Sequence, residues 1–238
     1  MDEFNKKHKS YHDIPPREYM YFPKGTIELG NPGEFSRLEI THLLISIIVL
    51  TIAFSFALTS NNMIELYYGG FKLNKLFIGI IKSFLGVIVA FFGHEISHKL
   101  IAQKYRLWSE YRMNNKGIIL ALILGLLTPV VFAAPGAVIF RGKVRIFEMG
   151  LIALSGPLAN ILIAFISFIL FLFLFIEMSV INEIFAFVCL INSVIATYNL
   201  LPLKIFDGYK ILKWNRNIWL ITFIGSFILM MAIIIKVF

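Results

Sequence analysis

Long apolar segments alternate with shorter polar segments along this chain. About 20 consecutive apolar residues form a helix long enough to cross the roughly 30 Å hydrocarbon core of a bilayer. Six segments reach or approach this length: 40–59, 76–104, 117–140, 146–176, 181–203 and 217–238. The pattern therefore predicts an all-α polytopic membrane protein with five to six transmembrane helices.

The segment 117–140 differs from the other five because two prolines, Pro129 and Pro135, interrupt it. Proline removes a backbone hydrogen bond and breaks or kinks a helix interior. Non-helical backbone at membrane depth is tolerated only where protein or a water-filled cavity surrounds it. Two interpretations follow. The segment is either a sixth span, or a membrane-re-entrant hairpin or short β segment after the second helix.

The basic residues distinguish these two interpretations, because cytoplasmic loops are enriched in lysine and arginine. If 117–140 re-enters, 17 of the 22 lysines and arginines lie on one side of the membrane, in 1–39, 104–116, 141–145 and 204–216. A sixth crossing would spread them over both sides. The charges thus favour five spans and a re-entrant segment. They predict a polar cytoplasmic segment, residues 1–39, followed by a transmembrane domain, residues 40–238.

Composition and charge narrow the function classes further. The chain has 238 residues, 58% of them hydrophobic and 15% charged, whereas soluble domains have about 45–50% apolar and about 25% charged residues. The net charge is +8, but the basic residues sit between apolar segments, which favours a role in topology over nucleic-acid binding. A single cysteine, Cys189, excludes a disulfide framework and a thiolate zinc site within the chain.

Residues 94–98 read His-Glu-Ile-Ser-His, within a segment predicted to be helical. Residues four apart share one helix face, so His94 and His98 can both reach a single cation, and Glu95 is offset to act on a water molecule. Ionisable groups within a span cost about 2.5 kcal/mol or more each and persist mainly where they are paired, hydrated or metal-bound. The pattern indicates a zinc hydrolase. The simpler alternative is a solvated helix end near Lys99 and Lys104.

A catalytic zinc ion usually has three protein ligands and an open position for water. Of the three aspartates, Asp207 is the one that directly follows a predicted span. Pro202 is expected to end that helix, and Gly208 to allow an unusual backbone angle. Asp207 is therefore a candidate ligand, although it could instead cap a short helix. Glu148, at the start of another span, is the rival third ligand.

Two separated motifs and a third element between them carry a family resemblance. Residues 94–98 match His-Glu-x-x-His, and residues 199–208 match Asn-x-x-Pro-x-x-x-x-Asp-Gly. Between them, residues 155–160 read Ser-Gly-Pro-Leu-Ala-Asn, similar to a Gly-Pro-x-x-Asn segment. With these elements, about residues 76 to 208 resemble the site-2 protease family of intramembrane zinc metalloproteases.

The resemblance implies one Zn²⁺ per chain, Glu95 as general base, and a metal site made by His94, His98 and Asp207. It further implies that Asn160 and Asn199 line the site, with the Asn160 amide as a candidate oxyanion donor. The implied activity is hydrolysis of peptide bonds in transmembrane segments, which is regulated intramembrane proteolysis. The expected partners are a transmembrane protein substrate and the lipid bilayer. The expected location is the cell membrane, with the site near the cytoplasmic side.

Two other functions fit parts of the same pattern. A prenyl-protein-type membrane zinc protease would use a distal glutamate such as Glu148 as the third ligand. A non-enzymatic metal-binding membrane protein would be a metal-binding transporter or a catalytically inactive chaperone of membrane segments. Glu95 favours an enzyme, because a binding site needs no general base.

Overall fold

The computed structural model describes residues 34–59, 67, 73–129, 131, 135–142, 144–173 and 180–237. Most of the predicted N-terminal polar segment, residues 1–33, lies outside the described residues.

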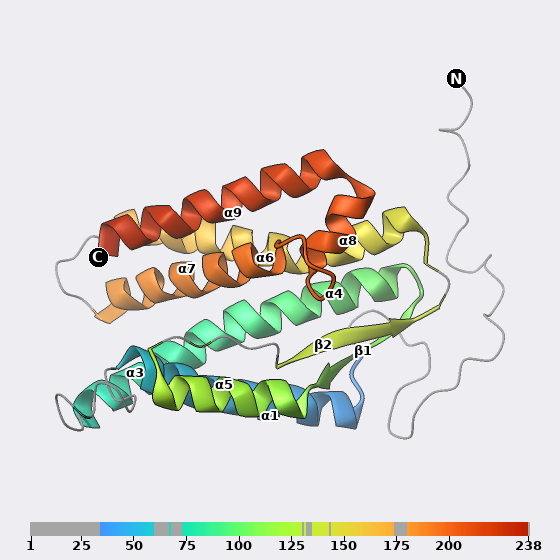
Figure 1. Ribbon diagram of the computed structural model, residues 1–238. Helices are drawn as coiled ribbons and strands as arrows, with labels where there is room; N and C mark the ends of the chain where they lie inside the picture. Colours follow the sequence, from blue (N-terminus) through green and yellow to red (C-terminus); the bar gives the residue numbers. More distant parts are fainter. Residues whose placement is uncertain are drawn as a thin grey trace.

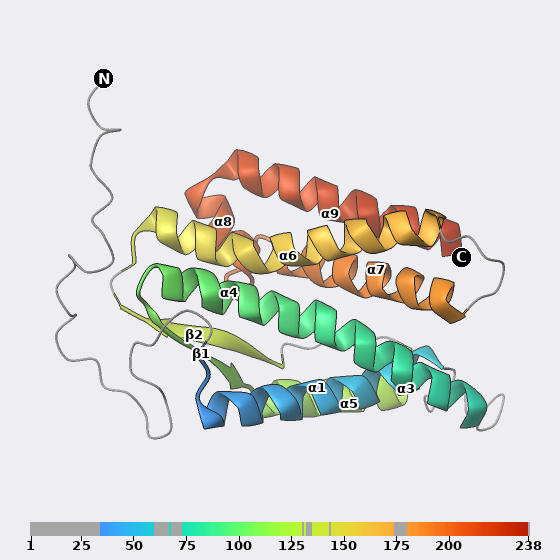
Figure 2. The same cartoon turned by 180° about the vertical axis from the view of Figure 1, so that it is seen from behind.

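Five helices in the described residues are long and apolar enough to cross a membrane. They are α1 (Arg37–Leu58), the continuous helix formed by α3 (Leu73–Val87), a π-helical turn (Ile88–Phe92) and α4 (Gly93–Lys104), then α6 (Ile146–Phe173), α7 (Val180–Asn199) and α9 (Arg216–Val237). They run lengthwise beside one another (Figures 1 and 2). The predicted all-α membrane fold is confirmed, and these helices fall in five of the six predicted segments.

The sixth segment is not one continuous helix. It contains the short apolar helix α5 (Asn115–Leu127) and most of strand β2 (Gly136–Arg141), which pairs in antiparallel fashion with β1 (Trp108–Met113). Because Met113 is the register partner of Gly136, the chain leaves the sheet and returns to it at the same place. At 1.5 Å per residue, α5 is about 20 Å long and shorter than the hydrocarbon core. The short β segment expected after the second helix is present.

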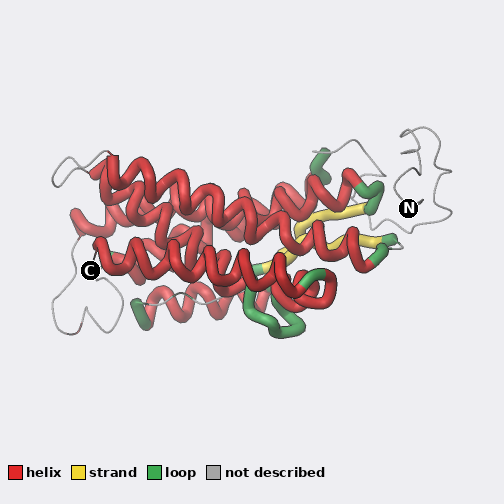
Figure 3. The backbone as a smooth tube through the Cα atoms, turned by 90° about the horizontal axis from the view of Figure 1, so that it is seen from above, coloured by secondary structure: helices red, strands yellow, loops and turns green. Residues whose placement is uncertain are grey.

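The two strands form a ribbon at one end of the bundle, as Figure 3 shows. Strand β1 packs against α1 and α4, and β2 packs against α4. A core that includes Leu43, Phe91, Tyr111 and Ile191 joins α1, the π-helical turn, β1 and α7. The ribbon is thus held between α1 and α4, directly beside the histidine motif.

Helix α8 (Asp207–Trp214) follows the turn after α7 and packs against α6. Helix α7 ends at Asn199, before Pro202, as the sequence predicts. The expectation of an unusual backbone angle at Gly208 is wrong, because Gly142 is the single glycine with positive φ among the described residues. A glycine is required at 208 for another reason. A Cβ there would lie 2.1 Å from the Leu200 carbonyl oxygen.

Candidate metal centre

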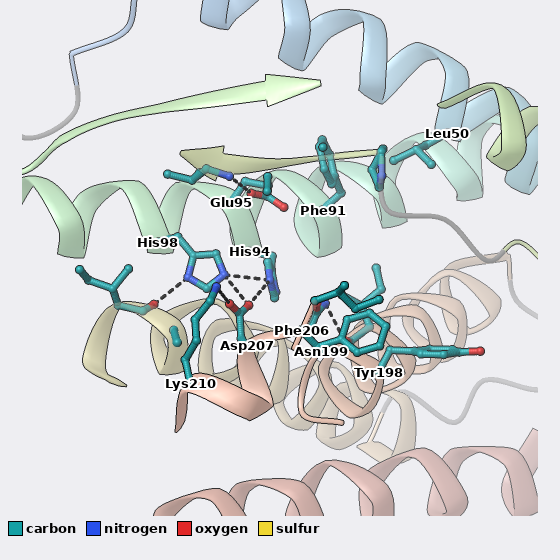
Figure 4. Close-up of a pocket in the computed structure, with 18 of the residues that line it drawn as sticks. Leu50, Phe91, His94, Glu95, His98, Tyr198, Asn199, Phe206, Asp207 and Lys210 are labelled. Carbon is teal, nitrogen blue, oxygen red and sulfur yellow. Dashed lines mark hydrogen bonds and ion pairs between the residues drawn. The ribbon is translucent and has the colours of Figure 1, made fainter. Parts of the chain in front are cut away.

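The structure brings together His94 and His98 of α4 and Asp207 of α8 (Figure 4). One ligand atom from each residue lies within 4.8 Å of the others. The three residues are between 4% and 8% exposed. A solvated helix end does not fit this burial. Within the described part of the chain, no second group of three such side chains gathers in this way.

The hydrogen bonds of the histidines leave one nitrogen of each ring directed toward Asp207. His98 Nδ1 donates to the Ile152 carbonyl at 2.7 Å, and His94 Nδ1 donates to Asn160 Oδ1 at 2.5 Å. Nε2 of each ring therefore carries the lone pair. Asp207 Oδ2 lies 2.9 Å from His98 Nε2 and 3.5 Å from His94 Nε2. Two imidazole nitrogens and one carboxylate oxygen fit the donor set of a catalytic zinc site. The hydrogen bond at Nδ1 fixes the orientation of each ring, as is usual for histidine ligands.

Lys210, one turn along α8, was not singled out from the sequence. Its Nζ donates to Asp207 Oδ1 at 2.9 Å, which leaves Oδ2 for the histidines. Burial alone would raise the pKa of Asp207. The neighbouring imidazoles of His98 and His94 and the charge of Lys210 instead lower the pKa well below its usual value. The carboxylate is therefore kept in the ionised form that a metal ligand needs.

Two residues of helix α6 lie against the histidines. Gly156 leaves room for the imidazole rings, and Asn160 hydrogen-bonds to one of them. A Cβ at Gly156 would lie 2.4 Å from His98 Nε2 and 2.8 Å from His94 Cε1. The Asn160 side chain is fully buried, and its amide donates to the Ala90 carbonyl at 2.8 Å and to Asn192 Oδ1 at 2.9 Å. Both amide hydrogens are thus engaged. This geometry speaks against the oxyanion role expected for Asn160 and indicates that the residue orients His94.

Glu95 lies on the side of α4 that faces β2, away from Asp207 (Figure 4). Its Oε2 accepts a hydrogen bond from the Val138 backbone N–H at 3.1 Å. A cavity of about 240 Å³ is lined by Glu95, by the three metal-site residues, by β2 and by apolar side chains of α1 and α7. Asn199 also lines it, although its amide donates to the Ile195 carbonyl at 3.0 Å. The candidate base and the metal donors therefore share one cavity.

Three other ionisable residues of the membrane-length helices lie outside this cluster. His42 on α1 accepts a weak hydrogen bond from the Met113 N–H at 3.4 Å. Lys82 pairs with Glu183. Glu148, the rival third ligand, is held at the start of α6 by the Arg145 backbone N–H and guanidinium, at 3.0 Å and 2.7 Å. Glu148 is not among the residues that gather at the candidate metal site.

The fold and the site define a membrane protein with a buried metal centre of the hydrolytic type. The comparison with known proteins agrees with this class. The chain is 41% identical over 189 residues to a protein of Methanocaldococcus jannaschii named "Putative zinc metalloprotease MJ0611", and the match covers 79% of this chain and 90% of the relative. This chain belongs to the same family of zinc metalloproteases. No family model matches the sequence, and no solved structure matches the chain.

Membership in this family and the observed donor set together identify zinc as the cofactor of this membrane metalloprotease.

Proposed function

We propose that this protein is an intramembrane endopeptidase of the site-2 protease type, which hydrolyses peptide bonds in the transmembrane segments of other membrane proteins. One observation carries the proposal. The three metal donors and Glu95 line a cavity whose other walls are largely apolar side chains of membrane-length helices. Such a cavity suits an apolar polypeptide segment better than a soluble peptide.

His94, His98 and Asp207 would hold the zinc ion. When bound, zinc supplies a Lewis acid that polarises a carbonyl group and lowers the pKa of a water molecule. The groups that hydrogen-bond to the three ligands hold them in position. Asn160 and the Ile152 carbonyl fix the rings, and Lys210 fixes Asp207. Partners of this kind preserve ligand orientation.

Glu95 is the proposed general base. Its carboxylate takes a proton from the attacking water as the new carbon–oxygen bond forms at the peptide carbonyl. It then gives that proton to the leaving amine nitrogen as the carbon–nitrogen bond breaks. Glu95 is 8% exposed and its Oε2 is held by Val138 N–H at 3.1 Å, so few conformations are open to it.

The substrate segment would have to unwind before cleavage, because a transmembrane helix satisfies all of its backbone groups internally. Strand β2 offers a partner for the extended form. Its residues Gly136 to Val138 line the cavity, and the edge of β2 away from β1 faces it. A peptide added along this edge would replace its lost internal hydrogen bonds.

The proposed orientation follows from the basic residues. The loops that precede β1 and α6, and the segment that carries α8, hold most of the lysines and arginines of the described residues outside the spans. These loops are proposed to be cytoplasmic, together with the N-terminal segment. Asp207 and the end of α4 then lie near the cytoplasmic side, from which water can reach the site.

The test compares wild-type protein with His94→Ala, Asp207→Ala and Glu95→Gln in detergent. Elemental analysis should find about one zinc per wild-type chain and much less in the first two variants. Glu95→Gln should keep its zinc, but its rate of cleavage of a helical transmembrane segment should fall by a factor of about 10² or more. Wild-type protein that binds zinc and cleaves no such segment, with Glu95→Gln indistinguishable from it, would instead support a non-enzymatic metal-binding protein.

The same assay addresses the prenyl-protein-type protease through Glu148. Glu148→Ala should retain zinc, because its carboxylate pairs with Arg145 and is not part of the metal cluster. Zinc lost in Glu148→Ala and kept in Asp207→Ala would favour the prenyl-protein type.

A further inference from the structure

Among the described residues, the outer edge of strand β1 is bonded by side chains and not by a third strand. In an antiparallel pair, successive residues direct their backbone groups alternately toward and away from the partner strand. Ser109 and Tyr111 direct theirs away from β2. Glu39 Oε1 accepts from the Tyr111 N–H at 2.9 Å, and Lys99 Nζ donates to the Ser109 carbonyl at 3.2 Å. Glu39 and Lys99 thus bind two of the outward backbone groups of β1, and His42 accepts from a third, the Met113 N–H, at 3.4 Å.

Glu39 and Lys99 also form an ion pair with each other, with Lys99 Nζ 2.5 Å from Glu39 Oε2. Both residues are buried, at 0% and 1% exposure, and the Phe35 ring lies 4.5 Å from Lys99 Nζ. Removing two charges from water is costly, and buried ion pairs can often be replaced by apolar residues without loss of stability. The contacts with the β1 edge, rather than stability alone, therefore explain why charged groups lie here.

The opposite edge of the ribbon is held at the same position along the strands. Tyr111 and Val138 are register partners. The Tyr111 N–H donates outward to Glu39, and the Val138 N–H donates outward to Glu95. The register pair Tyr111–Val138 is therefore bonded on both edges of the ribbon by a buried glutamate. Glu39 on α1 is connected to Glu95 on α4 through the width of the ribbon.

We propose that Glu39 and Lys99 are positioning residues for peptide hydrolysis. Together they act in place of a third strand along β1, and they fix the ribbon so that the Val138 N–H holds the Glu95 carboxylate. They also close the β1 edge, which leaves the β2 edge as the one available to an extended substrate. The inference rests on the proposed function for its catalytic consequence, whereas the fixed position of the ribbon is measurable without any substrate.

The experiment compares two double variants of the full chain in detergent. Each variant removes the charge of Glu39 and the charge of Lys99. E39Q/K99M keeps an oxygen that can accept from the Tyr111 N–H, and E39L/K99M does not. Amide hydrogen exchange in residues 108–113 should be at least tenfold faster in E39L/K99M than in E39Q/K99M. Zinc content should stay at about one per chain in both variants. Cleavage of a transmembrane segment should show a kcat at least tenfold lower in E39L/K99M than in E39Q/K99M.

The two measurements separate the possible failures. Equal exchange in the two double variants would overturn the inference, whether or not the protein cleaves a substrate. Loss of zinc in both variants would also overturn it, because the pair would then be needed for the bundle as a whole. If the exchange difference is found but wild-type protein cleaves no membrane segment, the ribbon contact stands, and the proposed function and the catalytic role fail.

Discussion

Lys210 donates a hydrogen bond to Oδ1 of Asp207 at 2.9 Å, while Oδ2 of the same carboxylate lies 2.9 Å from His98 Nε2. The two oxygens of the Asp207 carboxylate thus have different partners. Oδ1 contacts a lysine on the same helix, and Oδ2 faces the two histidines on α4. This division favours binding of a metal ion through Oδ2 alone. It also places the lysine charge beside a negative ligand in a buried site.

Lys210→Met should weaken zinc binding about 10- to 100-fold, because partners that orient a metal ligand typically contribute this much to affinity. The dissociation constant can be measured by competition with a chromophoric chelator. Lys213→Met is the matched control. It lies on the same helix, and its ammonium group contacts the Tyr209 ring rather than the metal site. Equal affinities in the two variants would show that Asp207 needs no support from Lys210.

Gly156→Ala should abolish zinc binding at stoichiometric metal concentration. The added Cβ would lie 2.4 Å from His98 Nε2 and 2.8 Å from His94 Cε1, so at least one imidazole must move away from its donor position. Gly93→Ala is the control, since its Cβ would meet Ile163 at an ordinary 3.5 Å. Although Gly93 directly precedes His94, this variant should keep its zinc and gain up to about 1 kcal/mol in helix stability. Elemental analysis and thermal unfolding check both expectations.

Asn160→Ala distinguishes orientation of His94 from stabilisation of an oxyanion. Because Asn160 Oδ1 accepts from His94 Nδ1 and both amide hydrogens are engaged elsewhere, zinc affinity should fall about 10- to 100-fold. The kcat at saturating zinc should fall much less. If Asn160 were an oxyanion donor, the variant would instead have normal zinc affinity and a kcat about 10²-fold lower. Zinc titration and steady-state kinetics on one preparation measure both quantities.

The membrane-length helices could be predicted from the sequence, since about 20 apolar residues in a row have few alternatives to a helix in lipid. The position of the metal donors could be anticipated in part. His94 and His98 follow from helical spacing alone. Asp207 followed from its place beside a span and from a family resemblance, because no local rule connects residues more than 100 positions apart.

The supporting contacts could not be predicted in the same way. Asn192 and the Glu39–Lys99 pair act through contacts between elements distant in sequence, and nothing in their local sequence marks them. Lys210 lies only three residues from Asp207, but its role depends on how Asp207 meets the histidines of α4. The β-ribbon is a similar case. Prolines show that 117–140 is interrupted, but the pairing of Tyr111 with Val138 depends on how α1 and α4 enclose the strands. Gly208 shows the reverse error, because a glycine was interpreted through its backbone freedom when its lack of a side chain is what matters.

The last prediction concerns the hydrogen bond between the ribbon and the candidate base. The Val138 N–H points away from β1 and donates to Glu95 Oε2, so a proline at this position removes that donor without removing a hydrogen bond between the strands. Val138→Pro should therefore keep its zinc and the wild-type rate of amide exchange in residues 108–113. Its kcat should fall about tenfold or more, since a hydrogen bond to a charged group contributes about 1.5–3 kcal/mol.

Val138→Ala is the control for the lost side chain, because it retains the N–H and should keep most of the wild-type kcat. Ile139→Pro is the control for the sheet. Its N–H points toward β1 by the alternation of the ladder, so amide exchange in residues 108–113 should be faster in this variant than in the wild type. If Val138→Pro and Val138→Ala cleave a transmembrane segment at the same rate, the amide has no part in positioning Glu95. The base must then be held by the cavity wall alone.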